Sequence, residues 1–231
     1  MYWGPIVIVI IIVFFVWASA DIGSGVYLKT LCRKHTDKPF VALTFDDGPD
    51  VDMTPRVLDT LGRYGVKATF FLVGEKVRKY PDLVRRIVDE GHIIGNHTYT
   101  HSTVFPLSGS QSVQKEITDT QRAVEDIAGV KMRLFRPPFG VTNPIIGNVV
   151  QHCGLQTIGW SVRSFDTFER RERADVCKRI KRKLHNGAVI LLHDRCKDAD
   201  VLLEHILEEI KACHRQVVML DKLFEIEKYE N

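Results

Sequence analysis

Short apolar runs rich in β-branched residues alternate with amphipathic segments along most of this chain of 231 residues. The runs read VALTF, ATFFLVG, HIIGN, LFRPP, QTIGWSV, AVILLH and QVVML. Between most of them, apolar residues recur at helical spacing, and several of these segments end at a glycine. About seven such units in series predict parallel strands joined by crossover helices.

The runs are apolar almost throughout, which is typical of parallel strands that are buried on both faces of a sheet. Residues 39–231 are therefore predicted to form one α/β domain, a distorted barrel of the (β/α)7 type. An open parallel α/β sheet is the alternative. Residues 21–38 are more polar and are predicted to connect this domain to the N-terminal segment.

The first 20 residues carry a different signal. The stretch Pro5–Trp17 is apolar and uncharged, and Ala18-Ser19-Ala20 matches a small-x-small cleavage site, so the segment resembles a secretory signal. No Lys or Arg precedes the apolar stretch, which is also shorter than the ~20 residues of a typical transmembrane helix. We predict an exported protein, periplasmic or extracellular. Cleavage of residues 1–20 as a signal peptide and retention of residues 5–18 as a membrane anchor are both open.

The charge of the chain gives no sign of a nucleic-acid partner. The formal net charge is only +3, and basic residues are interleaved with acidic ones in stretches such as RRERADVCKRIKRKLH, which is typical of a solvated helix face. The five cysteines form no CxxC pair, so they predict neither a cysteine zinc site nor a redox motif. We expect no nucleic-acid partner, mostly free thiols and a monomeric protein.

Charged and metal-binding residue types follow several of the predicted strands. Asp46 and Asp47 end the first run, His97 and His101 follow the third, and Arg136 follows the fourth. Ligands of parallel α/β folds bind at the carboxyl ends of the strands, so these side chains are expected to converge. Two histidines and one carboxylate are a common catalytic zinc arrangement that leaves a position open for water. A cation together with Arg136 would also offset the two adjacent carboxylates.

Four motifs in register point to a known family. TFDDGPD, HTYTH, RPPFG and LLH, in this order and at these separations, closely resemble the motifs of the polysaccharide deacetylases, which are carbohydrate esterase family 4 and contain the NodB homology domain. The resemblance covers nearly all of the chain from about Phe40 to its end. It implies the NodB-like deacetylase fold. It also implies a hydrolase that removes acetyl groups from N-acetylated glycans, such as peptidoglycan or chitin-like polymers, and releases acetate.

The resemblance also implies a metal site and a general base. Asp47, His97 and His101 would bind one divalent cation, with Zn²⁺ as the first choice and Co²⁺ or Ni²⁺ as alternatives. Asp46 would be the general base, and Arg136 would orient it. The cation would polarise the acyl carbonyl and lower the pKa of the attacking water.

Further positions of the resemblance concern the leaving group and the acyl group. His193 would be the general acid, and Leu191 would line the pocket for the acetyl methyl group. Phe139 stands where the family usually has Tyr, but the role there belongs to the backbone N–H, which donates to the oxyanion. From its residue type alone, Trp160 is either part of the core or a groove wall that contacts sugar through its ring face.

One motif departs from the family pattern. The fourth motif is usually Asp-x-x-Asp-Trp, and its first Asp tunes the acid His. Here RSFDT occupies this position, so Arg163 replaces the first Asp, Thr167 replaces the Trp, and Asp166 matches the second Asp. A cation near His193 would lower the pKa of this imidazole and weaken it as an acid. We therefore expect that Asp166 or Asp194 tunes His193, that Arg163 points elsewhere, or that the acid step is slow.

Three other functions stay open at this point. The same groups would hydrolyse O-acetyl esters of polysaccharides, or other acyl and amide substrates. A non-catalytic glycan-binding module that kept the metal site is the alternative from another class, and the Arg163 departure is its only support.

Overall fold

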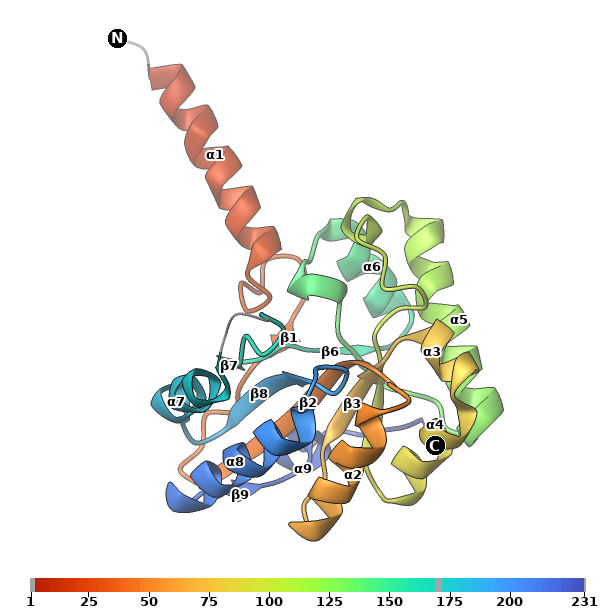
Figure 1. Cartoon of the computed structure of the whole chain (residues 1–231). Helices are drawn as coiled ribbons and strands as arrows, with labels where there is room; N and C mark the ends of the chain where they lie inside the picture. Colours follow the sequence, from red (N-terminus) through yellow and green to blue (C-terminus); the bar gives the residue numbers. More distant parts are fainter. Residues whose placement is uncertain (1–2, 169–171, 231) are drawn as a thin grey trace.

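Parallel strands form one curled sheet in the computed structural model, which describes residues 3–168 and 172–230 (Figure 1). The strands are β1 Thr30–Leu31, β2 Phe40–Gly48, β3 Thr69–Leu72, β4 Ile93–Asn96, β5 Leu134–Phe135, β6 Gln156–Ile158, β7 Val162–Arg163, β8 Ala188–His193 and β9 Gln216–Val217. Their order across the sheet is β1-β6-β5-β4-β3-β2-β8-β7, and β9 pairs with β2. All these pairs are parallel, and no pairing within the described ranges joins β1 to β7. The predicted α/β fold, a distorted barrel, is thus confirmed.

Helices alternate with the strands and cover the outside of the sheet (Figure 1). They are α1 Trp3–Ala20, α2 Met53–Arg63, α3 Gly74–Lys79, α4 Pro81–Asp89, α5 Ser110–Ala128, α6 Pro144–His152, α7 Arg173–Lys183, α8 Ala199–Ala212 and α9 Leu220–Phe224, with 3₁₀ turns η1 Phe105–Leu107 and η2 Pro138–Gly140. Local sequence sets several of the ends. Pro81 opens α4, where its missing N–H costs nothing, and Gly129 ends α5 at a φ of 67°, which glycine adopts without strain.

The strand β2 lies at the centre of the sheet, between β3 and β8. Its residues 41–48 are all buried. Leu43 and Phe45 belong to the core shared with α2 and α8, whereas Ala42 belongs to a second apolar cluster that includes residues of α9. Because both faces are covered, the strand shows no polar alternation. Its carboxyl end, which carries Asp46 and Asp47, therefore emerges in the middle of the fold.

Two parts of the sheet differ from the sequence-based expectation. The run QTIGWSV divides into β6, which pairs with β5 and β1, and β7, which pairs with β8. The chain crosses between these partners around Trp160, so one apolar run serves two places in the sheet. The segment 21–38, predicted as a polar connector, contributes β1 to the sheet. The expected basic helix around residues 170–183 is described from Arg173 onward, and residues 169–171 lie outside the described residues.

The apolar N-terminal segment forms α1, which projects away from the α/β domain (Figure 1). Its 18 residues are long and apolar enough to cross a membrane by length and composition, and residues 6–17 are all exposed. Ala18, in contrast, is fully buried, and its carbonyl accepts the hydroxyl of Ser24 at 2.9 Å. The carbonyl of Ser19 accepts the backbone N–H of Thr142 at 3.0 Å. The last turn of α1 is thus built into the domain.

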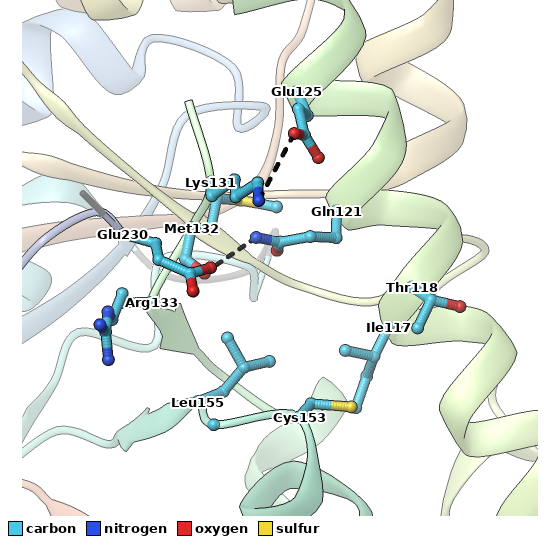
Figure 2. Close-up of a pocket in the computed structure, with 11 residues that line it drawn as sticks. Ile117, Thr118, Gln121, Glu125, Lys131, Met132, Arg133, Cys153, Leu155 and Glu230 are labelled. Carbon is cyan, nitrogen blue, oxygen red and sulfur yellow. Dashed lines mark hydrogen bonds and ion pairs between the residues drawn. The ribbon is translucent and has the colours of Figure 1, made fainter. Parts of the chain in front are cut away.

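A pocket of about 350 Å³ lies beside α5, away from the strand ends that carry the predicted site (Figure 2). It is lined by Ile117, Thr118, Gln121, Glu125, Lys131, Met132, Arg133, Cys153, Gly154, Leu155 and Glu230. Its polar contacts are internal, because the Gln121 amide donates to the Met132 carbonyl at 3.0 Å and Lys131 lies 4.0 Å from Glu125. None of the predicted site residues lines it.

Candidate active site

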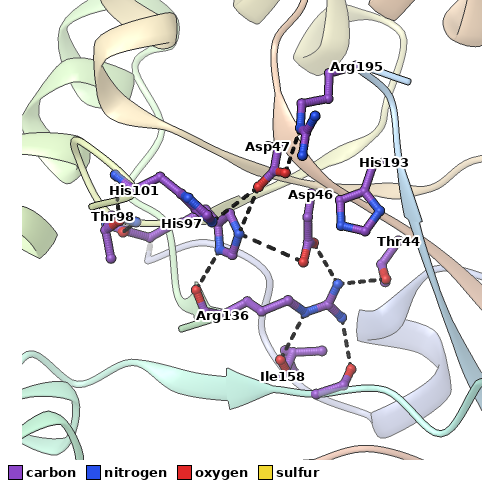
Figure 3. Close-up of polar contacts among 12 residues, drawn as sticks. Thr44, Asp46, Asp47, His97, Thr98, His101, Arg136, Ile158, His193 and Arg195 are labelled. Atoms are coloured by element: carbon purple, nitrogen blue, oxygen red, sulfur yellow. Dashed lines mark hydrogen bonds and ion pairs between the residues drawn. The ribbon is translucent and has the colours of Figure 1, made fainter. Parts of the chain in front are cut away.

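The side chains predicted from the strand ends meet at one place (Figure 3). Asp46 lies opposite His193 in the register between β2 and β8, so the two come from adjacent strands. His97 follows β4, the neighbour of β3, and Arg136 follows β5. The convergence results from parallel pairing, which brings the carboxyl ends of all these strands to one edge.

A local irregularity turns Asp47 toward the same site as Asp46. Successive side chains of a regular strand point to opposite faces of the sheet. The register between β2 and β3 shifts between Asp46 and Gly48, and Asp47 has a φ of 70°, in the left-handed region. This bulge, of a kind common next to active sites, allows both carboxylates to reach the same site.

Asp47, His97 and His101 form a cluster that fits a metal ion. Oδ1 of Asp47 lies 3.4 Å from Nε2 of His97 and 3.2 Å from Nε2 of His101, and the three ligand atoms lie within 4.8 Å of one another. Nδ1 of His97 donates to the Arg136 carbonyl at 2.7 Å, which leaves Nε2 as the electron-pair donor. Burial lowers the pKa of His101 to about 4, so this imidazole is neutral and able to bind a metal at neutral pH. Two nitrogens and one carboxylate oxygen are a donor set that suits Zn²⁺.

The second carboxylate, Asp46, is held by a buried guanidinium. Nη1 of Arg136 donates to Oδ1 of Asp46 at 2.7 Å and to the hydroxyl of Thr44 at 2.8 Å. Nε and Nη2 of Arg136 donate to the carbonyls of Ile158 and Gly159 at 3.1 and 2.8 Å. Burial lowers the pKa of Arg136, and the charge of Asp46 opposes this shift. Because the guanidinium is bonded on several sides, it can fix the orientation of Asp46.

His193 is paired with a carboxylate from the divergent fourth motif. Its Nδ1 lies 2.7 Å from Oδ1 of Asp166, and its backbone N–H donates to Oδ2 of the same residue at 2.8 Å. Burial alone would lower the pKa of His193, but the hydrogen bond and charge of Asp166 outweigh it and raise that pKa. The expectation that Asp166 substitutes in tuning the histidine therefore agrees with the geometry.

The side chain of Arg163 lies against aromatic rings. Its guanidinium lies over the rings of Phe165 and Trp160, at 4.8 and 5.7 Å from their centroids, and the residue is exposed. Asp194, the other candidate for tuning, is fully buried and accepts the hydroxyl of Thr54 at 2.5 Å. Of the expected alternatives, the contact of Asp166 with His193 is observed, and the guanidinium of Arg163 lies over the Phe165 and Trp160 rings.

The remaining predicted residues lie around this centre. Phe139 is in η2 with a φ of 60°, and its ring lies 4.9 Å from that of His101. Leu191 is buried in β8 and, being two residues before His193, points to the same face of the sheet. The half-buried Trp160 packs against Gly140, where an added Cβ would lie 2.5 Å from the indole. Trp160 thus supports the loop that carries Phe139.

Two cations at the site were not found from the sequence. Nε of Arg195 donates to Oδ2 of Asp47 at 2.7 Å, and Nζ of Lys76 donates to the Asp47 carbonyl at 2.6 Å. Burial would raise the pKa of Asp47, but neighbours such as His97 and Arg195 hold that pKa well below its usual range. The only sequence signal was position, since Arg195 stands two residues after the LLH motif and Lys76 follows the end of β3 closely.

A family model described as polysaccharide deacetylase matches residues 33–158, which is more than half of the chain. The chain belongs to the polysaccharide deacetylase family. The matched range contains the cluster of Asp47 with the two histidines, as well as Asp46 and Arg136. It ends before Asp166 and His193, so the arrangement of that pair rests on the contacts described above.

Named relatives and solved structures agree with this membership. The peptidoglycan-N-acetylglucosamine deacetylase PgdA of Listeria monocytogenes is 39% identical over 201 residues, which are 87% of this chain and 42% of the relative, so the chain spans less than half of that protein. The structure of the peptidoglycan N-acetylglucosamine deacetylase Bc1960 is 31% identical with a TM-score of 0.82 and covers 87% of this chain and 95% of its own. The structure of BA3943, a family 4 pseudoenzyme from Bacillus anthracis, is 30% identical with a TM-score of 0.78. The match covers 84% of this chain and 68% of the BA3943 chain.

Proposed function

We propose that this chain is a metal-dependent deacetylase of N-acetylated glycans, with the N-acetylglucosamine of peptidoglycan as the first choice of substrate. The observation that supports this most is the pair of side chains beside the three-ligand cluster. Neither Asp46 nor His193 is one of the three ligands, although Oδ2 of Asp46 lies 3.8 Å from Nε2 of His97, and each is held by a fixed partner, Arg136 or Asp166. A carboxylate and an imidazole so placed supply the base and the acid that amide hydrolysis needs. The substrate follows the names of the relatives.

The chemistry divides among residues of this one chain, and we propose that it acts as a monomer. The cation, when bound, would polarise the acyl carbonyl and lower the pKa of the attacking water. Asp46, oriented by Arg136, accepts a proton from that water. The backbone N–H of Phe139 donates to the developing oxyanion. His193 holds a proton on Nε2, since Nδ1 is bonded to Asp166, and donates it to the leaving amine.

The products are acetate and a free amino sugar. In this scheme Leu191 packs against the acetyl methyl group, and Trp160 contacts the sugar through its ring face. The same groups would cleave an O-acetyl ester, and a chitin-like polymer offers the same acetamido group as peptidoglycan. These substrates are therefore the alternatives to test, together with other acyl or amide compounds.

A non-catalytic glycan-binding module is the second candidate, because the similar structures include a pseudoenzyme. Its support from the sequence was the Arg163 departure. The guanidinium of Arg163 lies over Phe165, and Asp166 bonds His193 in its place. With Asp166 bonded to its Nδ1, His193 is not expected to be a weak acid. This geometry supports the enzyme over the binding module.

Acetate release tests the proposal. The full chain in detergent is incubated with N-acetylglucosamine oligomers and with peptidoglycan, with added zinc and again with chelator. We expect acetate only with metal, and none from the Asp46→Asn variant. A folded, zinc-loaded chain that releases no acetate from these glycans or from O-acetyl xylan, yet binds one of them, would establish the binding module instead.

We further propose that the protein is exported and that α1 stays attached as a membrane anchor. At ~1.5 Å per residue α1 is about 27 Å long, close to the ~30 Å hydrocarbon core of a bilayer. Cleavage after Ala20 would remove the buried Ala18 and the bond from Thr142 to Ser19, three residues from Phe139. The mass of the chain purified from the membrane fraction of expressing cells checks this. A mature chain that begins at Asp21 would establish cleavage instead.

A further inference from the structure

Asp47 is hydrogen-bonded to cationic side chains at both its backbone and its carboxylate. At its backbone, the carbonyl accepts Nζ of Lys76 at 2.6 Å. At its side chain, Oδ1 faces the two histidines of the cluster, and Oδ2 accepts Nε of Arg195 at 2.7 Å. The two carboxylate oxygens therefore have different partners, one in the cluster and one outside it.

With its backbone held, the carboxylate of such a residue can still turn about its side-chain bonds. Rotation about the Cβ–Cγ bond of Asp47 would swing Oδ1 away from the two histidines of the cluster. The hydrogen bond from Arg195 to Oδ2 opposes this rotation, because it would stretch and break as Oδ2 moves away from Nε. Groups that bond to metal ligands in this way commonly orient them and tune the metal.

Arg195 is itself well placed to act as a fixed donor. It stands two residues after His193, the last residue of β8, and its neighbour Asp194 is completely buried and bonded to Thr54. The backbone N–H of Cys196 donates to the His193 carbonyl at 3.4 Å, which closes a turn around Arg195. The side chain of Arg195 is 44% exposed, so its charge is screened by solvent more than that of the buried Arg136. The directed hydrogen bond, more than the charge, is then its main effect on Asp47.

We propose that Arg195 is a positioning residue for Asp47. Its Nε donates to Oδ2, so that Oδ1 is the oxygen that would face a cation together with His97 and His101. This inference deepens the proposed metal-dependent function and rests on it. Arg195 would thereby connect β8, which carries the predicted acid, to the metal ligand at the end of β2.

Two substitutions separate the hydrogen bond from the charge. In Arg195→Gln, the amide nitrogen lies at the same position along the side chain as Nε of arginine, so a donor to Oδ2 is kept while the charge is lost. In Arg195→Met, a side chain of similar length has neither donor nor charge. Arg56→Met is the matched control, because Nε of Arg56 donates to Oδ2 of Asp200 at 2.9 Å in an exposed pair away from the cluster.

The measurement is the zinc affinity of the full chain, obtained by competition with a chromophoric chelator in the absence of substrate. We expect Arg195→Met to weaken zinc binding by about 10-fold or more, as is typical for loss of a group that bonds a metal ligand. Arg195→Gln and Arg56→Met should bind zinc close to the wild-type affinity. Wild-type affinity in Arg195→Met, or an equal loss in the Gln and Met variants, would overturn the proposal.

This test is independent of turnover. If the wild type binds zinc and Arg195→Met binds it equally well, the positioning role fails while the deacetylase proposal stands. If the expected zinc affinities are found but the wild type releases no acetate, the positioning role stands and the proposed activity fails. A wild-type chain that binds none of Zn²⁺, Co²⁺ and Ni²⁺ would overturn both.

Discussion

Asp166 bonds His193 through both of its carboxylate oxygens. Oδ1 lies 2.7 Å from Nδ1 of the imidazole, and Oδ2 accepts the backbone N–H of the same residue at 2.8 Å. The double contact fixes the carboxylate relative to the ring and keeps the proton of Nδ1 directed at it. In the proposed mechanism Nε2 is then left for the leaving group, and the raised pKa of His193 favours the protonated form that an acid requires.

Asp166→Asn should move the alkaline limb of the pH–rate profile to lower pH. In the proposed mechanism activity needs His193 protonated, so it should fall as the pH rises through the pKa of this imidazole. The Asp166 carboxylate raises that pKa, and its removal lowers it, so the limb moves to lower pH. The measurement is kcat/KM against pH on an N-acetylglucosamine oligomer. Arg163→Ala is the matched control, since Arg163 lies over Phe165 and should leave the limb in place. A shift in the Arg163 variant alone would show that Arg163, and not Asp166, sets the pKa of His193.

Asp46→Asn should lose turnover and keep its metal. Asparagine cannot accept the proton from water, and loss of a general base typically costs about 10²–10⁴-fold in rate. Asp47 and the two histidines are unchanged, so zinc content should stay at the wild-type level. The substitution leaves the buried charge of Arg136 without its counter-ion, so thermal unfolding is recorded alongside to verify folding. Loss of zinc in a folded variant would exchange the proposed roles of Asp46 and Asp47.

His97→Ala should lose metal affinity by more than the about 10–100-fold typical of an outer partner, because a direct ligand is removed. Zinc content after gel filtration, measured by atomic emission, checks this. His205→Ala serves as the control, because His205 is an exposed residue of α8 that lies outside the cluster. Unchanged zinc in His97→Ala would remove this histidine from the ligand set.

The sequence predicted the class of fold because strand burial is local information. Each apolar run of β2, β3, β4 and β8 is long enough to show that both faces are covered. The division of QTIGWSV into β6 and β7 could not be predicted, since the residues between them are as apolar as the strands. The strand β1 is only two residues long and lies in a polar segment, so it has no periodicity to detect.

The site residues, like the strands, could be predicted only in part from the sequence. Motif spacing identified Asp46, Asp47 and the histidines because parallel strands bring their ends together. Motif spacing could not predict where each side chain lies. Arg163 occupies an acidic position of the motif, yet its guanidinium lies over an aromatic ring. Arg195 and Lys76 were missed because a single cation near a strand end resembles any solvated residue, and their partner Asp47 is 148 and 29 positions away.

A last prediction concerns Asp194, which lies beneath the turn that follows Asp47. Its Oδ2 would lie 2.4 Å from a Cβ added at Gly48, so only a glycine fits against it. Burial raises the pKa of the Asp194 carboxyl from 3.8 to about 7. The folded chain therefore keeps this proton at pH values where the unfolded chain has lost it.

The sign of the effect on stability follows from this difference. Because the folded state binds the extra proton, the stabilising contribution of Asp194 is complete at low pH and is lost as the pH rises toward about 7. The free energy of unfolding should fall by up to about 1.4 kcal/mol per pH unit from this group alone. Asp194→Asn does not titrate, so its free energy of unfolding should depend less on pH between 5 and about 7. Urea unfolding of both chains with chelator present measures the two slopes, and parallel slopes would mean that Asp194 is ionised in the folded protein.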